Sequence, residues 1–160
     1  MIFPEVYINQ PSSFEDFRGE LFTSYKKGDY NLDFNHDKVS ISKKNVLRGL
    51  HGDSKSFKLI TCLAGEVLLV VVDNRPESKN YLKWDSIILT SKNRKQVLIP
   101  PMFANGHLIL SDEATFFYKW SYKGNYPDVN DQFTLKWNDP KIGIHWPISN
   151  PILSKRDYSK

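Results

Sequence analysis

Cysteine is almost absent from this sequence, because Cys62 is the only one among 160 residues. A single thiol excludes an internal disulfide bond and leaves no thiolate cluster for a metal ion. Cys62 lies in an apolar run with Leu59, Ile60 and Leu63, where a small buried side chain is the usual role. The thiol is therefore expected to be structural.

Long hydrophobic runs are also missing. The longest, residues 67–72, is far too short to cross a bilayer, and the N-terminus lacks the succession of basic, apolar and small residues of a signal peptide. We therefore expect a cytoplasmic protein without a membrane partner.

Charge of one sign is not concentrated anywhere. The net charge is +4, and the lysines are scattered apart from pairs such as Lys26-Lys27 and Lys43-Lys44. A nucleic-acid-binding protein would gather such charges on one face, so no nucleic-acid partner is expected. A mild positive balance suits a diphosphate ligand equally well.

The common metal and nucleophile motifs are absent too. The sequence has no His-x-His pair, no His-Glu-x-x-His and no Gly-x-Ser-x-Gly turn, and His51-Gly52-Asp53 supplies only half of the ligand set of a metal-dependent cupin oxygenase. We expect no metal and no other cofactor. His36 and His145 are interpreted as structural or surface residues.

What the chain does contain is a succession of short strands. Residues 57–63 and 67–73 are rich in β-branched and aliphatic side chains, and Ala64-Gly65-Glu66 between them predicts a hairpin. Residues 81–90 with 95–99, and 107–110 with 115–122, are predicted to pair in the same way. Pro100-Pro101 cannot sit inside a central strand, so a turn is expected there.

This spacing predicts a mainly β protein, a sandwich or barrel formed by one domain over residues 1–160. Short helical turns are expected near residues 11–15 and at the C-terminus. The last thirty residues are rich in turns and are expected to wrap around the barrel.

Residues 45–67, NVLRGLHGDSKSFKLITCLAGEV, hold the best candidates for chemistry. Alternate side chains of a barrel strand point inward, so Arg48, His51 and Lys58 could face one cavity. The spacing alone is equally consistent with solvated surface charges and a polar histidine at the mouth of the barrel.

Several strings in this chain resemble the dTDP-4-dehydrorhamnose 3,5-epimerase family. EDFRGELF, VLRGLH, KLITCLAGEVLLVVVDNR, VLIPPMFANGH, FFYK, WNDPKIGIHWP and PILSKRD follow one another in the family's order, from about Asp16 to Asp157. The resemblance implies a cupin-like jelly-roll β-barrel and a homodimer. It also implies an enzyme that inverts carbon 3, carbon 5 or both of a nucleotide-linked 4-keto sugar.

The family's catalytic roles carry over onto matching residues. By resemblance, His51 is the base, Asp157 orients it, and Tyr118 is the acid on the opposite face. Lys58 matches the lysine near the keto oxygen of the sugar. Without the resemblance, Tyr118 would be interpreted as a core aromatic and Asp157 as a charge in a frayed C-terminus.

The resemblance also implies substrate-binding residues. Arg18 and Arg48 match arginines near the sugar and the diphosphate, where a guanidinium binds phosphate well. Glu20 lies in the same segment as Arg18 and is assigned to the substrate site with it.

The chain departs from the family where FAHGF becomes FANGH. Asn105 stands in the position of a pocket histidine and cannot act as a base. His107 lies two residues further along a strand and therefore on the same face, so it could replace that histidine. Local packing of His107 is the other interpretation, and both Asn105 and His107 are counted as substrate-binding candidates.

A second departure, HGD in place of HFQ, bears on the substrate. Together with the Asn-x-His segment and DQFTLKWND, it resembles the branch that acts on GDP-linked 4-keto-6-deoxy-heptoses for bacterial capsules. The alternatives are the dTDP-4-keto-6-deoxyglucose 3,5-epimerase of the rhamnose pathway, a 3,4-ketoisomerase, and a cupin that binds a sugar nucleotide without catalysis.

Overall fold

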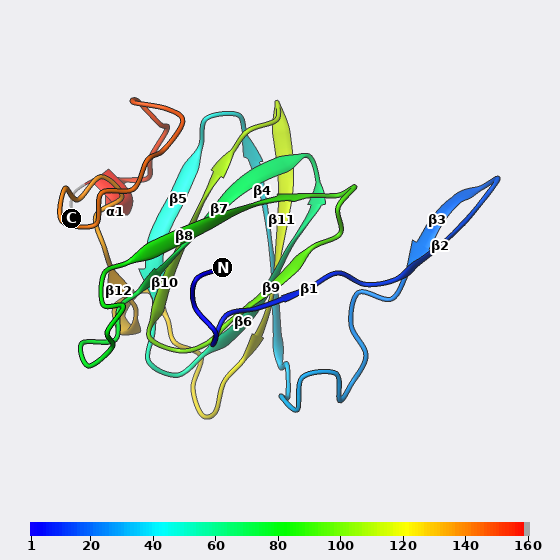
Figure 1. Cartoon of the computed structure of the whole chain (residues 1–160), viewed down its shortest axis with the longest axis horizontal. Helices are drawn as coiled ribbons and strands as arrows, with labels where there is room; N and C mark the ends of the chain where they lie inside the picture. Colours follow the sequence, from blue (N-terminus) through cyan, green and yellow to red (C-terminus); the bar gives the residue numbers. More distant parts are fainter. Residues whose placement is uncertain (159–160) are drawn as a thin grey trace.

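The computed structural model describes residues 1–158 and consists almost entirely of antiparallel strands (Figure 1). Two five-stranded sheets have the orders β1-β9-β6-β11-β4 and β12-β5-β10-β7-β8, and β2 and β3 form a separate hairpin. The strands are β1 (Tyr7–Asn9), β2 (Ser13–Asp16), β3 (Gly19–Phe22), β4 (His36–Lys43), β5 (Leu47–Gly52), β6 (Phe57–Ala64), β7 (Glu66–Asp73), β8 (Trp84–Thr90), β9 (Gln96–Ile99), β10 (Phe103–Ile109), β11 (Glu113–Ser121) and β12 (Phe133–Thr134). The expected all-β class is confirmed.

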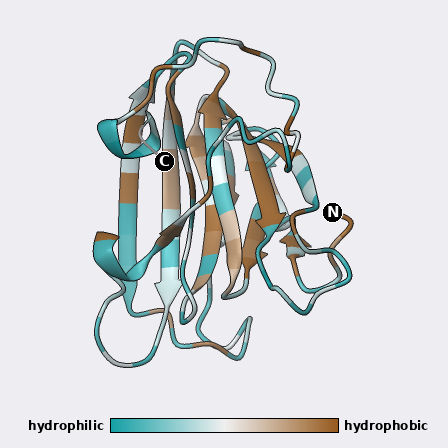
Figure 2. Cartoon of the chain, turned by 90° about the vertical axis from the view of Figure 1, so that its left-hand side faces the viewer, coloured by the Kyte–Doolittle hydropathy of each residue, from teal (hydrophilic) through white to brown (hydrophobic). Residues whose placement is uncertain are grey.

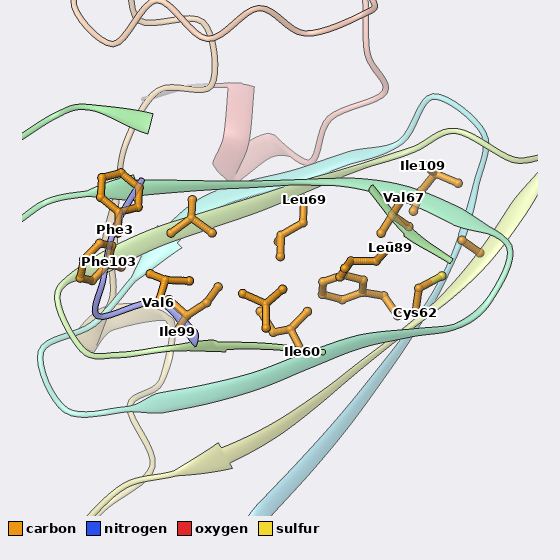
Figure 3. Close-up of a cluster of buried hydrophobic side chains, with 14 residues drawn as sticks. Phe3, Val6, Ile60, Cys62, Val67, Leu69, Leu89, Ile99, Phe103 and Ile109 are labelled. Carbon is orange, nitrogen blue, oxygen red and sulfur yellow. The ribbon is translucent and has the colours of Figure 1, made fainter. Parts of the chain in front are cut away.

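The space between the two sheets is filled by apolar side chains that alternate along the strands. Val67 and Leu69 of β7 are fully buried and face Ile60 and Cys62 of β6 (Figure 3), and Val71 is fully buried in the same cluster. Removing each such side chain from water stabilises the fold by about 1.5–3 kcal/mol. Cys62 is buried as expected, and burial raises the pKa of its thiol to about 11.

The outer face of the second sheet is covered by residues 133–146. Val70 and Val72, which point away from the first core, pack with Leu50, Ala104 and Ile142 in a second apolar cluster. Both faces of β7 are therefore covered. This explains why Val70, Val71 and Val72 follow one another without the alternate polar residues of a strand that has one face in water. Figure 2 shows that hydrophobic residues gather on the strands and hydrophilic residues on many of the connecting loops. The last thirty residues were expected to wrap around the barrel, and residues 133–146 do so on the side of the second sheet.

The predicted hairpins are wrong, although the strands themselves lie where they were expected. β6 pairs with β9 and β11, whereas β7 pairs with β8 and β10, so the turn at Gly65 carries the chain from one sheet to the other. The same holds for the turns between β8 and β9 and between β10 and β11. A hairpin and an arch between two facing sheets bury the same alternate side chains, so the periodicity could not distinguish them.

The turn at Gly65 shows why the crossing is possible. Its φ is +76°, and a Cβ atom there would lie 2.2 Å from the carbonyl oxygen of Glu113. Only glycine adopts this conformation and leaves room for the neighbouring backbone.

Of the two expected helical turns, one is confirmed. Residues 155–158 form α1 (Lys155–Tyr158), and a second short helical segment, η1 (Val129–Asp131), lies in the loop after β11. The turn expected near residues 11–15 is wrong, because Ser13–Asp16 is β2 of a hairpin that projects from the barrel (Figure 1). Pro100-Pro101 lies between β9 and β10 as expected. No helix in the part of the chain that the structure describes is long and apolar enough to cross a membrane.

Candidate active site

One end of the barrel holds a cavity of about 380 Å³, and most of the residues that line it carry polar or charged groups. β4, β5, β6, β10 and β11 contribute to it, and the loop containing η1 and the C-terminal segment complete the wall. Its lining consists of Lys38, Val39, Ser40, Arg48, His51, Lys58, Asn105, Tyr118, Trp120, Tyr126, Asp128, Val129, Gln132, Ser154, Arg156 and Asp157.

His51 and Asp157 form a hydrogen-bonded pair in this cavity. Nε2 of His51 lies 2.6 Å from Oδ1 of Asp157, although the two residues are 106 positions apart. The Asp157 side chain is 3% exposed, whereas the His51 side chain is 24% exposed and open to the cavity. Ser154 Oγ donates a hydrogen bond of 2.7 Å to the second oxygen of Asp157. Asp157 is therefore fixed in α1 and not frayed.

The environment of Asp157 keeps it ionised. Burial would raise the pKa of this carboxyl, but the hydrogen bonds from His51 and Ser154 outweigh burial and hold the pKa below its usual range. An ionised carboxylate beside an imidazole orients the ring and stabilises the imidazolium that forms when His51 accepts a proton.

The segment around His51 is placed by a close approach of two strands. A Cβ atom on Gly49 would lie 2.5 Å from the Cα atom of Gly106, so β5 and β10 meet there only because both residues are glycines. Asn105 is the cross-strand neighbour of His51, and both line the cavity.

Tyr118 enters the cavity from β11. Burial raises the pKa of its phenol above the usual range, and the charge of Arg48 opposes only part of that rise. The ring packs edge-on against Phe116, with centroids 4.8 Å apart. A phenol that keeps its proton at neutral pH in a fixed orientation is suited to donate it.

Lys58 is the charged residue at the end of β6 that faces the cavity. It is 4% exposed, its ammonium lies 3.3 Å from Oδ2 of Asp53, and it stands 4.6 Å from the ring centroid of Trp120. Burial lowers the pKa of Lys58, and the charge of Asp53 opposes that effect. Arg48 completes the set from β5, where its Nε donates a 3.0 Å hydrogen bond to Ser42.

His107 lies deeper in the barrel and does not line the cavity. It is 1% exposed, and its ring stacks on Phe116 with centroids 3.8 Å apart. Neither ring nitrogen has a hydrogen-bond partner among the described residues. Burial lowers the pKa of His107 to about 3, so the ring is neutral. This geometry matches the local-packing interpretation, while Asn105 occupies the wall of the cavity.

Arg18 and Glu20 are not brought to the cavity of their own chain. Arg18 lies at the tip of the projecting hairpin, is 75% exposed and pairs with Asp16 at 2.6 Å. Glu20 pairs with Arg94 instead. The six candidates that the structure does bring together are Arg48, His51, Lys58, Asn105, Tyr118 and Asp157.

Sequence reasoning missed five charged or aromatic residues of the site, Lys38, Trp120, Tyr126, Asp128 and Arg156. The ammonium of Lys38 lies 5.4 Å from the ring centroid of Trp120 and hydrogen-bonds to the hydroxyl of Tyr126. Arg156 adds another cation to the wall, next to Asp157. The alternation of β4 and β11 could have suggested Lys38 and Trp120, since they lie an even number of residues from Ser40 and Tyr118.

The cavity combines groups suited to proton transfer. A carboxylate-oriented imidazole can act as a base, a buried phenol can act as an acid, and a buried ammonium can stabilise a developing oxyanion. No cluster of three or more residues suited to hold a metal ion occurs in residues 1–158. The surrounding cations Lys38, Arg48 and Arg156 suit an anionic ligand.

Comparisons with known proteins agree over the whole length of the chain. Residues 1–160 match the family described as dTDP-4-dehydrorhamnose 3,5-epimerase. The enzyme of that name from Salmonella typhimurium is 41% identical over 164 residues, which cover 96% of this chain and 88% of that protein.

Solved structures give the same result. The 3,5-epimerase RmlC from Legionella pneumophila, in complex with dTDP-4-keto-L-rhamnose, has a TM-score of 0.90 and 35% identity, covering 98% of this chain and 87% of that one. NovW from Streptomyces spheroides, a 4-keto-6-deoxy sugar epimerase, has a TM-score of 0.92 and 30% identity, covering 99% and 83%. The cupin-like jelly-roll architecture is thereby confirmed.

Proposed function

Because this chain belongs to the dTDP-4-dehydrorhamnose 3,5-epimerase family, we propose that it epimerises a dTDP-linked 4-keto-6-deoxy sugar at carbon 3, carbon 5 or both. The chain is an enzyme of the isomerase class that acts on sugar nucleotides. The observation that carries the proposal is the hydrogen-bonded His51–Asp157 pair in one cavity with Tyr118 and Lys58.

The chemistry of a 4-keto sugar explains why these residues belong together. The hydrogens on carbons 3 and 5 are acidic, because the carbanion left by their removal delocalises onto the oxygen at carbon 4. His51 removes such a proton, and Asp157 stabilises the resulting imidazolium. Tyr118 returns a proton to the opposite face, which inverts the carbon. Lys58 stabilises the enolate oxygen, an electrostatic contribution that is often the largest in such reactions.

The nucleotide is proposed to be dTDP rather than GDP. The Salmonella relative is named for dTDP-4-dehydrorhamnose, and the Legionella enzyme was solved with dTDP-4-keto-L-rhamnose. These findings favour the rhamnose-type alternative over the GDP-linked heptose expected from the HGD and FANGH departures. Lys38, Arg48 and Arg156 are the cations that we assign to the diphosphate.

A homodimer and a cytoplasmic location remain predictions. The projecting hairpin carries three exposed apolar side chains, Phe14, Phe17 and Leu21, which are 64%, 98% and 74% exposed. A second copy of the chain would remove them from water and would also give Arg18 a possible place in an assembled site.

The test is proton NMR in deuterated water with dTDP-4-keto-6-deoxyglucose as substrate. We expect the signals at carbon 3 and carbon 5 to disappear faster than in an enzyme-free sample, which measures spontaneous exchange. Loss of one signal alone would identify a single inverted carbon. A GDP-linked 4-keto-6-deoxy-heptose, run in parallel, ranks the two nucleotides.

The same experiment separates the alternatives. A 3,4-ketoisomerase would move the carbonyl to carbon 3, which carbon-13 NMR of the product detects. Tight binding without exchange for either nucleotide would contradict the proposal and indicate a non-catalytic cupin.

A further inference from the structure

Asp53 lies outside the catalytic set but contacts one member of it. The residue follows β5 in the short loop to β6 and is 2% exposed. Its Oδ1 accepts hydrogen bonds from the backbone N–H groups of Lys55 and Ser56, at 2.9 Å and 2.7 Å. Its Oδ2 lies 3.3 Å from the ammonium of Lys58. One oxygen therefore fixes the loop and the other faces the lysine.

Lys58 needs this carboxylate because its other surroundings disfavour a positive charge. The ammonium is buried, and the charges of Lys38 on β4 and Arg156 on α1 act against it. The ring of Trp120 on β11 offers partial compensation through its π face. The remaining titratable groups that line the cavity with Lys58 are Arg48, His51, Tyr118, Tyr126, Asp128 and Asp157. Asp53 is the carboxylate in direct contact.

The stability of the fold does not explain why Asp53 and Lys58 form a buried ion pair. Taking both charges out of water costs about as much as their attraction returns, so buried ion pairs contribute little net stability. A neutral lysine would relieve the cost of burial, but it could not stabilise an oxyanion. The pair is more readily explained by what the charged lysine does in the cavity.

We propose that Asp53 is a positioning residue that keeps Lys58 charged and directed into the cavity, where the ammonium stabilises the enolate oxygen. This inference rests on the proposed epimerase function and adds a residue to it. Asp53 acts through Lys58 and does not touch the substrate.

The test is Asp53→Asn, which removes the charge but keeps an oxygen for the two backbone hydrogen bonds. Solvent-deuterium exchange into dTDP-4-keto-6-deoxyglucose is measured from pH 6 to pH 10. Wild-type exchange should decline at high pH, because Lys58 loses its proton there. In the variant this decline should begin about 1 to 3 pH units lower. At pH 8 the rate should fall by about 10-fold to 100-fold.

Two further measurements address Lys58 directly. Carbon-13 NMR of lysine-labelled protein follows the Cε signal of Lys58, assigned by its loss in Lys58→Arg, and its midpoint should move down in Asp53→Asn. Lys58→Arg in the Asp53→Asn background should remove the high-pH decline, because a guanidinium stays charged. If Asp53→Asn does not fold, Asp53→Ser replaces it, since the hydroxyl oxygen can still accept from the loop.

The matched control is Asp112→Asn, which breaks the exposed pair with Lys44, 3.5 Å apart and outside the cavity. It should leave the rate and the pH profile of exchange unchanged. If wild-type exchange is normal but the variant's midpoints stay at the wild-type pH, the role of Asp53 is refuted and the epimerase function stands. If the wild-type protein shows no exchange, the proposed function fails, and the inference fails with it.

Discussion

The two ends of the barrel interior are built by the same strands yet have opposite character. On β6, Ile60 and Cys62 belong to the apolar core, whereas Lys58, two residues before Ile60, lines the cavity. On β11, Phe116 is in the core, and Tyr118 lies two residues further toward the cavity. A step of two residues along a strand, about 6.6 Å, changes a packed interior into a reactive one.

Two histidines of the barrel, His51 and His107, differ in the same way. His51, at the open end, shares a hydrogen bond with an ionised carboxylate and reaches the cavity. His107 lies on β10, opposite Arg48 of β5. Its ring stacks on Phe116 and has no hydrogen-bond partner among the described residues. The two imidazoles therefore differ in partner and in access to the cavity, although both lie in the barrel.

The largest expected effect is that of His51→Asn, which removes the proposed base. Deuterium exchange into the 4-keto sugar should fall by about 10⁴-fold, the upper range for a general base. NMR of the substrate in deuterated water measures the rate. The matched control is His145→Asn at an exposed position, which should exchange at the wild-type rate. Undiminished exchange in His51→Asn would refute the assignment of the base.

A smaller effect is expected for Tyr118→Phe, which removes the proposed acid while keeping the ring. Proton removal should be reduced less than inversion, because the proton for the opposite face is missing, and inversion should fall by about 10²-fold. Comparing deuterium exchange with the appearance of inverted product separates the two steps. Tyr122→Phe, a tyrosine that does not line the cavity, is the control. Equal loss of exchange and inversion would argue against Tyr118 as the acid.

The smallest expected effect is that of His107, and it concerns the free energy of unfolding. The pKa of His107 is about 3 in the folded chain, below the ordinary value of 6.5, so the unfolded chain binds a proton that the folded chain does not. Stability is therefore lost as pH falls from about 6.5 toward about 3, by about 1.4 kcal/mol per pH unit.

His107→Phe should remove this sensitivity to acid. Between pH 7 and pH 5, the loss of unfolding free energy should be smaller in the variant by about 2 kcal/mol. Urea denaturation at the two pH values measures it, and His145→Asn provides the baseline for an exposed imidazole. An identical pH dependence of the wild type and His107→Phe would mean that His107 titrates normally in the fold.

Much of the fold and part of the site could be predicted from residue patterns. The alternation of residues 57–63 and 67–73 located two strands, and Pro100-Pro101 located a turn. The candidates Arg48, His51 and Lys58 do face one cavity. The pairing of strands could not be predicted, because inward-facing residues look the same whether the next strand lies in the same sheet or in the opposite one.

Contacts between site residues far apart in the chain could not be predicted from local patterns either. Asp157 was connected with His51 only through resemblance to a family, since no spacing rule links positions 106 residues apart. Asp53 looked like half of a metal motif, and the structure instead places it against Lys58. Arg18 and Glu20 were expected at the site, yet the hairpin holds them away from the cavity of their own chain.

An all-β chain, the approximate positions of most strands and membership of a family of sugar-nucleotide epimerases could all be predicted from the residues in order. These properties follow from alternation, turn residues and ordered motifs, which are local. The tertiary fold, in contrast, set which sheet each strand joined and which end of the barrel stayed polar. It also decided that of two histidines on neighbouring strands one meets a carboxylate and the other a phenyl ring. Partner, burial and charge come from contacts between distant segments, and these contacts set the chemistry of each side chain.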